Sequence, residues 1–202
     1  MKILIASTNF GKIQEITHLI QEMQWPDMTV VSLKDFDIPE SDEPYEDFLA
    51  NAKHKAQHYG KATGHITLSD DSGLCIQGLK GFPGVRTKEF VIDCGGLDKA
   101  YAKLQEMMTG ITDYKAWFHA ATVLYFPKTE EFLTHEAQDH GQITFPPRGP
   151  LTQGFGCDPI FIPDGYDITL SEMSFEEKNK ISHRGKAIRG LMKELQQSLS
   201  QE

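Results

Sequence analysis

The chain has 202 residues, a length that suits one large domain or two small ones. Its 39% hydrophobic and 24% charged residues are typical of a globular protein and exclude a disordered or collagen-like chain. No apolar run approaches the roughly 18 residues of a membrane span, and the N-terminus, MKILIAS, lacks the long apolar segment of a secretory signal. We therefore expect a cytoplasmic protein without membrane contact. Its three cysteines have no metal-binding or redox spacing, so we expect reduced thiols at Cys75, Cys94 and Cys157.

The net charge of −9 argues against a wide nucleic-acid surface, because binding to a phosphate backbone depends on clustered Lys and Arg. The charges are nevertheless segregated along the chain. Residues 35–47 contain seven acidic and no basic residues, whereas residues 178–193 contain six basic and no acidic ones. The two stretches are either two solvated faces or the two sides of a site, one for a divalent cation and one for an anion.

Hydrophobic periodicity predicts alternating strands and helices. In chain order we expect a strand at 2–6, a polar turn at 7–12, helices at 13–23 and 46–59 with Gly60 as the stop, a strand at 66–69, an acidic turn at 70–73, a Gly/Pro loop at 78–84, a helix at 99–108, and strands at 118–126, 132–135 and 142–145. Ser174 and Glu177 have the spacing of a capping box, and Ser182 precedes the pattern of a last helix. We expect an α/β fold, a mixed sheet with flanking helices, in a single domain (1–202) with two lobes.

The segment STNFGK (7–12) lies between the first strand and the first helix. A helix N-terminus offers unpaired N–H groups, Thr8 and Asn9 offer polar side chains, and Lys12 offers a positive charge, which together suit a phosphate. The spacing differs from that of a Walker A loop. Taken alone, the segment is equally typical of a capped helix start with a surface lysine.

Two consecutive aspartates, Asp70 and Asp71, follow an apolar strand in SDDSGL (69–74), and Glu43 lies upstream. Adjacent carboxylates are unfavourable at such a place unless one of them meets a cation or a proton-accepting partner. Mg²⁺ suits this pattern, because it takes carboxylate oxygens and shares its other positions with water and substrate phosphates. A carboxylate there could also orient or deprotonate water. The alternative is an Asx turn, in which one aspartate bonds its own backbone.

Two later segments carry groups that suit recognition. In GFGCDPIF (154–161), Phe155 is a flat ring among glycines that could stack on a nucleobase, or else a core residue. In EKNKISHRGK (177–186), a His and an Arg present several donors to a base oxygen or to phosphate, or else form a solvated helix start.

Together, the segments STNFGK, LANAKHKA, SDDSGL, GFPG, GFGCDPIF and SHRGKAI resemble the inosine/xanthosine triphosphate pyrophosphatase family. The resemblance covers nearly the whole chain. Members of that family hydrolyse aberrant purine nucleoside triphosphates to the monophosphate and pyrophosphate. The resemblance implies a central nucleotide-binding cleft, a purine nucleoside triphosphate as the substrate, Mg²⁺ as the cofactor and a homodimer. The implied reaction is attack of water on the α-phosphorus with pyrophosphate as the leaving group.

The resemblance also implies a role for each motif residue. Asp71 would be the general base, supported by Asp70, and Asp71 with Glu43 would bind Mg²⁺. The triphosphate would be held by Ser7, Thr8, Asn9, Phe10, Gly11 and Lys12, with Asn9 and Lys12 as the main contacts, and Ser72 would reach the substrate. Phe155 would stack on the base, with Gly156 and Cys157 beside it. The polar edge of the base or the adjacent phosphate would be lined by Asp158, Lys178, His183 and Arg184. Donors from His183 and Arg184 would favour a 6-oxo purine over adenine.

Two positions depart from the family pattern. Glu89 stands where the family usually has an arginine after GFPG, and Cys157 stands where it usually has an aromatic residue. Two other functions are therefore kept as alternatives: a Maf-type nucleotide pyrophosphatase with another specificity, and a catalytically silent nucleotide-binding protein. The GFGCDPIF and SHRG segments speak against the first alternative, and the retained aspartate pair speaks against the second.

Overall fold

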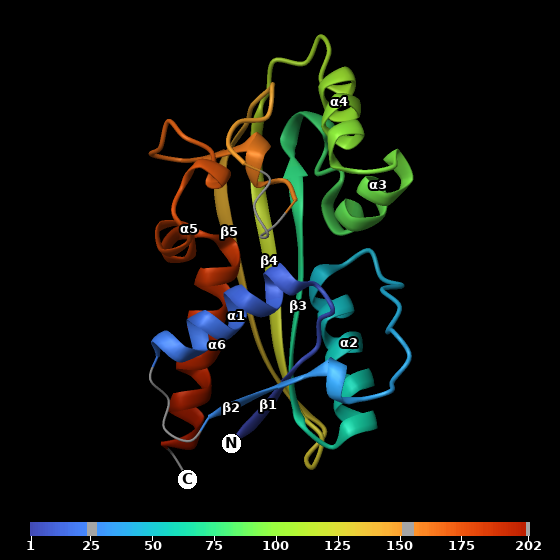
Figure 1. Cartoon of the computed structure of the whole chain (residues 1–202), viewed down its shortest axis with the longest axis vertical. Coiled ribbons are helices and arrows are strands. Elements are labelled where there is room, and N and C mark those ends of the chain that lie inside the picture. The colour runs from blue at the N-terminus through green and yellow to red at the C-terminus, as the bar shows by residue number, and fades with distance from the viewer. Residues whose placement is uncertain (24–27, 151–155, 201–202) are drawn as a thin grey trace. The chain divides into compact units, whose positions relative to one another are not determined.

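The computed structural model describes residues 1–23, 28–150 and 156–200. Its strands form a six-stranded sheet in the order β2-β1-β3-β4-β5-β6 (Figure 1). The strands are β1 (Lys2–Ile5), β2 (Thr29–Ser32), β3 (Ile66–Ile76), β4 (Lys115–Phe126), β5 (Glu131–Ile143) and β6 (Phe161–Pro163). Strand β1 is parallel to both β2 and β3, whereas β5 and β6 are antiparallel. The sheet is therefore mixed, and the predicted α/β class is confirmed.

Six α-helices accompany these strands in the described residues. They are α1 (Phe10–Glu22), α2 (Phe48–Thr63), α3 (Thr87–Cys94), α4 (Leu97–Met107), α5 (Phe175–Ile181) and α6 (His183–Leu199). Short 3₁₀ turns are η1 (Leu33–Asp35), η2 (Gln77–Leu79), η3 (Gly84–Arg86), η4 (Asp158–Ile160) and η5 (Leu170–Glu172). Within the described ranges, every helix is too short or too polar to cross a membrane.

The chain divides into two compact units. Unit 1 contains Met1–Asp71, Ala120–Ala137 and Arg184–Glu202, and unit 2 contains Ser72–His119 and Gln138–His183. The chain passes from one unit to the other inside β3, β4 and β5 and at the start of α6. Both termini therefore belong to unit 1.

Unit 1 has a helix-covered sheet with a core on each face. Because side chains alternate along a strand, Ile3 and Ile5 of β1 pack with α1 and α6, whereas Leu4 packs with Tyr59 of α2 and with Leu33. Helices α1 and α6 therefore cover one face and α2 covers the other (Figure 1). The larger core of unit 1 comprises Ile3, Ile5, Ile16, Leu19, Ile20, Leu68, Leu124, Ile188, Leu191, Met192 and Leu195.

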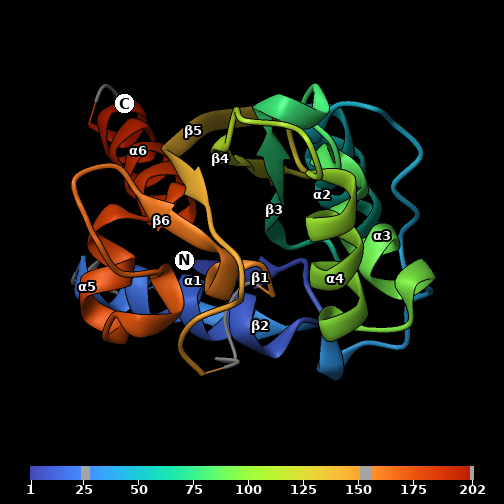
Figure 2. The same ribbon diagram turned by 90° about the horizontal axis from the view of Figure 1, so that it is seen from above.

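Unit 2 has one core, to which α4, β3, β4 and the segment after η4 contribute. Its helices α3 and α4 lie side by side (Figure 2). The core residues are Leu74, Ile76, Tyr101, Leu104, Met108, Ala116, Phe118, Ile143, Cys157, Ile160, Phe161, Leu170 and Met173.

The first two helices have other bounds than the sequence predicts. Helix α1 begins at Phe10, because the Asn9 side chain accepts a hydrogen bond from the Lys12 amide (3.1 Å) and caps the helix there. Helix α2 continues past Gly60 and ends before Gly64, which has the left-handed φ of 70°. Gly60 lies against the ring of Tyr125, where a Cβ atom would overlap the ring.

Three further predictions of local structure are wrong. The predicted turn at 70–73 is the middle of β3, because the pairing of this long strand in the sheet overrides the turn preference of DDSG. The predicted strands 132–135 and 142–145 fall on one strand, β5, which ends at Ile143. Helix α3 was not expected; it is eight residues long and carries a weak apolar pattern, with Thr87 as its only buried residue.

Replacing Gly60 by Ala tests the close approach to Tyr125. We expect Gly60→Ala to lower the free energy of unfolding by about 1 to 2 kcal/mol, although Ala is the better helix former, because the added methyl overpacks the site. Urea denaturation measures this difference. The loss should shrink when Tyr125 is shortened to Leu, and equal losses in both backgrounds would contradict the overlap.

Candidate functional site

The two aspartates of β3 face opposite sides of the sheet in unit 1. Neighbouring side chains of a strand alternate, and here Asp70 pairs with Lys12 of α1 and Arg184 of α6, whereas Asp71 pairs with Lys55 of α2. Each carboxylate therefore meets the helices that cover its own face. This arrangement depends on β3 continuing through both residues, which the predicted turn would not allow.

Asp70 lies in a buried network of ion pairs. Its Oδ2 is 2.8 Å from Lys12 Nζ and 3.4 Å from Arg184 Nη2, and Arg184 also pairs with Glu15. The side chains of Asp70 and Arg184 are each 1% exposed. Burial lowers the pKa of Arg184, but Asp70 and Glu15 outweigh it and hold that pKa above its ordinary value. The guanidinium therefore stays charged and pairs with both carboxylates.

Sequence reasoning missed Glu15. It lies three residues after Lys12 and four before Leu19, so it falls on the apolar face of α1, and it is almost fully buried. A carboxylate on a face that packs into the core is a signal for a buried partner, since an unpaired buried charge is strongly unfavourable. That signal could have identified an ion-pair network around α1 from the sequence.

Asp71 is paired on one oxygen only. Its Oδ1 is 3.5 Å from Lys55 Nζ, and Lys55 also pairs with Glu43. Its Oδ2 is buried and has no hydrogen-bond partner among the described residues. Burial raises the pKa of Asp71 to about 6, although Lys55 and Lys12 act in the opposite direction. The unsatisfied oxygen and the raised pKa are features of a carboxylate placed for chemistry.

Lys55 was not singled out from the sequence either, although it belongs to the LANAKHKA segment. Burial lowers the pKa of Lys55, but Asp71 and Glu43 outweigh it and raise that pKa above its ordinary value. Lys55 is therefore a cation that holds two carboxylates on the α2 face. Its distance of 12 residues from Glu43 spans a loop and two helical turns, so no local sequence pattern links the two.

The residues on the α2 face fit a divalent cation of the Mg²⁺ type. Glu43 and Asp71 supply two carboxylates that share Lys55, and Asp71 Oδ2 has a lone pair to offer. In residues 1–23, 28–150 and 156–200, no cluster of three or more His, Cys, Asp or Glu is preformed for a metal. Mg²⁺ needs no such cluster, because one or two carboxylates with water and substrate phosphates complete its coordination.

The STNFGK segment forms the start of α1. Asn9 is the N-cap, and its own amide donates to Ser7 Oγ (3.2 Å). Phe10, the first helical residue, is 61% exposed, whereas Gly11 is buried. Ser7 and Thr8 also line a cavity of about 220 Å³; its other residues are Ile13, Leu33, Lys34, Phe36, Ile38, Glu40 and Tyr59. A capped helix start with an adjoining cavity offers amides and hydroxyls to an anion.

Unit 2 holds the predicted base-recognition residues that the structure describes, except Arg184, which belongs to unit 1. Lys178 Nζ of α5 is 2.6 Å from Asp158 Oδ2 of η4, and both side chains are buried. The His183 ring is fully buried and stacks on Phe118 at 4.7 Å with an interplanar angle of 20°. Ser72, the first residue of unit 2, lies in β3. Phe155 lies outside the described residues.

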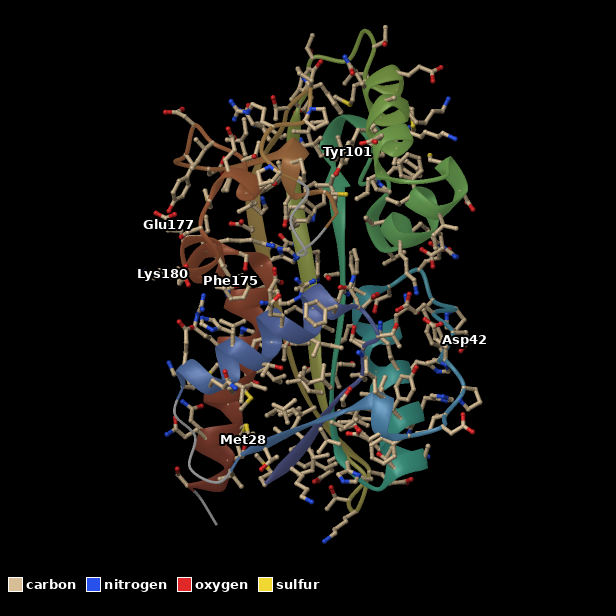
Figure 3. The ribbon with its side chains drawn as sticks, in the orientation of Figure 1. Met28, Asp42, Tyr101, Phe175, Glu177 and Lys180 are labelled. Atoms are coloured by element: carbon tan, nitrogen blue, oxygen red, sulfur yellow. The ribbon has the colours of Figure 1, made fainter. Side chains whose placement is uncertain are left out.

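Helix α4 holds the chain just before η4. The Tyr101 hydroxyl donates to the carbonyl of Gly156 (Tyr101 is labelled in Figure 3), and a Cβ atom at Gly156 would lie 2.6 Å from Leu97 Cδ2. Cys157 is buried beside them, and burial with the adjacent Asp158 raises the pKa of its thiol to about 12. Cys157 is therefore a packing residue and not a nucleophile. Nothing in the structure assigns a role to Glu89.

Comparisons with known proteins agree on one family. The model of the Ham1 family matches residues 3–194. The dITP/XTP pyrophosphatase of Gluconobacter oxydans is 38% identical over 93% of this chain and 87% of its own length, and that of Aquifex aeolicus is 38% identical over 95% of both. The structure of a HAM1 protein from Coxiella burnetii superposes with a TM-score of 0.85 at 31% identity, covering 98% of this chain and 99% of that one.

The raised pKa of Asp71 predicts a pH-dependent gain in stability for Asp71→Asn. The ordinary pKa of 3.8 becomes about 6 in the fold, so the folded state binds this proton more tightly than the unfolded state. Stability is therefore lost as pH rises from about 4 to above 6, and the Asn variant escapes this loss. We expect the metal-free variant to unfold at a higher temperature than the parent at pH 7, with the difference shrinking toward pH 4. Parallel profiles of thermal unfolding from pH 4 to 8 would contradict the shift.

Proposed function

The chain belongs to the Ham1 family, and from this premise we propose that it hydrolyses the non-canonical purine nucleoside triphosphates ITP, dITP and XTP to the monophosphate and pyrophosphate. It is a nucleoside-triphosphate diphosphatase, the class of enzyme to which its dITP/XTP pyrophosphatase relatives belong by name. The observation that carries the proposal is Asp71, a buried carboxylate with one oxygen unsatisfied, next to Glu43 and Lys55.

We propose that Asp71 is the general base. Its pKa of about 6 leaves it ionised at neutral pH and still basic enough to take a proton from water. Asp70 is unsuited to this role, because Lys12 and Arg184 both engage its Oδ2. Asp70 instead supports the site by holding Lys12 at the start of α1. The water that Asp71 activates attacks the α-phosphorus, and pyrophosphate leaves.

Glu43 and Asp71 would hold the metal, for which we propose Mg²⁺. When bound, Mg²⁺ neutralises the phosphate oxygens as negative charge develops in the transition state. Lys55 pairs with both carboxylates and holds them close together before the cation arrives. A bound cation also relieves the unfavourable burial of the Asp71 charge.

The triphosphate is bound by the STNFGK segment in this proposal. Asn9 and Lys12 are its main contacts, and Ser7, Thr8, Phe10 and Gly11 complete the segment. The Lys12 side chain is 15% exposed, so part of it stays accessible while its ammonium group contacts Asp70. A lysine in this position can exchange a water for a phosphate oxygen without leaving its carboxylate.

For the purine base, we propose stacking on Phe155 and polar contacts from the residues after it. Asp158 and Lys178 form a buried charged pair. Because the pair is held in a fixed geometry, it can recognise a purine edge that carries a donor and an acceptor in matching positions. Gly156, Cys157, His183 and Ser72 complete this set. The role of Arg184 at the base stays a prediction; in unit 1 its guanidinium is engaged by Glu15 and Asp70.

We also propose that the protein acts as a homodimer in the cytoplasm. The molecule that it binds is then the nucleotide, and we expect it to bind neither nucleic acid nor a membrane. The family resemblance supports the dimer, and the absence of an apolar span from the sequence supports the location. The purine specificity is favoured over that of a Maf-type enzyme by the GFGCDPIF and SHRG segments.

The reaction is tested by product analysis with Mg²⁺ and ITP, XTP, dITP, ATP, GTP or dUTP. We expect monophosphate and pyrophosphate from the inosine and xanthosine nucleotides, and at least about a hundredfold loss of rate in Asp71→Asn, since general-base catalysis is worth that much. Diphosphate with orthophosphate would move the attack to the γ-phosphorus. Binding without turnover would favour the silent nucleotide-binding alternative.

Replacing Phe155 by Ala tests base stacking. Stacking acts on the ground state and the transition state alike, so we expect KM for ITP to rise more than kcat falls. Steady-state kinetics with ITP measure both constants. A loss confined to kcat would contradict the stacking role.

A further inference from the structure

The segment between η1 and α2 is held along the whole of α2, although it contains no helix or strand. We call residues 36–47 the acidic arm. Successive turns of α2 hold successive positions of the arm, in antiparallel order: Asn51 with Tyr45, Lys55 with Glu43, His54 with Asp42, Tyr59 with Ser41, and His58 with Pro39. The arm follows the helix in Figure 1, and Figure 3 labels Asp42 on it. Because residues three and four apart share a helix face, one face of α2 makes all these contacts.

Asn51 makes the most specific contact of this series. Its Oδ1 accepts a hydrogen bond from the Tyr45 amide (2.9 Å), and its Nδ2 donates to the Tyr45 carbonyl (2.9 Å). One buried amide therefore satisfies both backbone groups of one arm residue, as a neighbouring strand would. A carboxylate at position 51 could make only the first of these bonds, and Ala could make neither.

Tyr59 fixes the other side of Glu43. The Ser41 amide donates to the Tyr59 hydroxyl (3.0 Å), and the Tyr59 ring is buried in the core of unit 1. Ser41 precedes Glu43 by two residues and Tyr45 follows it by two, so Glu43 lies midway between two hydrogen-bonded backbone positions. The His54–Asp42 pair is a weaker restraint, because the Asp42 side chain is 77% exposed.

We propose that Asn51 and Tyr59 are positioning residues that fix the backbone on both sides of Glu43, and thereby place its carboxylate beside Lys55 and Asp71 before a divalent cation binds. The inference rests on the proposed function in one respect, that Glu43 is a ligand of the cation. A ligand held in place loses less conformational freedom on binding, so these two residues set the affinity for the cation and leave the chemical step unchanged.

Hydrogen exchange of the metal-free protein tests the restraint itself. Asn51→Ala should remove protection from the Tyr45 amide and Tyr59→Phe from the Ser41 amide, while Asn51→Asp keeps part of the protection at Tyr45. Gln57→Ala is the matched control, since Gln57 lies on the same helix and makes no hydrogen bond or ion pair with the described residues of the arm. Unchanged exchange at Tyr45 and Ser41 would overturn the proposal.

Titration with Mg²⁺ tests the consequence. In Asn51→Ala we expect the half-activating Mg²⁺ concentration for ITP hydrolysis to rise about tenfold, with kcat at saturating Mg²⁺ within about twofold of the parent. The rise in unfolding temperature that Mg²⁺ alone produces should shrink in parallel, with Asn51→Asp intermediate and Gln57→Ala unchanged. A lower unfolding temperature with an unchanged Mg²⁺ requirement would reveal a structural role only and overturn the proposal.

Two further outcomes, a variant that does not fold and a parent without activity, can be distinguished from a failure of the proposal. If Asn51→Ala does not fold, Tyr59→Phe gives the answer, because it removes one hydroxyl and keeps the buried ring. If the parent hydrolyses no nucleotide, the proposed function fails, whereas hydrogen exchange and Mg²⁺-dependent unfolding still decide whether Asn51 and Tyr59 position Glu43.

Discussion

The structure of unit 1 depends on how two adjacent carboxylates are neutralised. Asp70 and Asp71 share a peptide bond in a buried strand, and their charges are kept apart only because the strand directs them to opposite faces of the sheet. Lys12 and Arg184 neutralise one, and Lys55 partly neutralises the other. This difference in ion pairing gives the two aspartates different roles. The carboxylate that two cations hold is structural, and the one that pairs with Lys55 keeps its Oδ2 for chemistry.

The sequence predicted the fold class well, because alternation of apolar periods is a local property. The prediction of local structure failed where tertiary contacts determine the conformation of the chain. Gly60 was expected to end a helix, but its missing side chain serves the approach of Tyr125 from a distant strand. The DDSG segment has the composition of a turn, yet β1 and β4 pair with the strand that contains it. Neither contact can be inferred from the neighbouring residues alone.

The candidate site shows the same division. Residues in contiguous motifs, such as Asp71 and Lys12, could be named from the sequence together with the family resemblance. Lys55, Glu15 and Asn51 were missed, because each acts through a partner on another element or loop. Glu15 alone left a visible trace, a charged residue on an apolar helix face. Asn51 left none, since an asparagine inside a helix is unremarkable until its backbone partner is known.

The ion pairs of Arg184 also bear on how the protein is made. Arg184 is 169 residues from Glu15 and 114 from Asp70 in the sequence. A ribosome delivers the N-terminal segments first, so Glu15 and Asp70 emerge long before the guanidinium that neutralises them. Until α6 is synthesised, Asp70 has Lys12 as a partner but lacks the guanidinium of Arg184. The native arrangement of unit 1 is therefore a late event in biosynthesis, and the nascent chain has no complete site with which to bind a nucleotide.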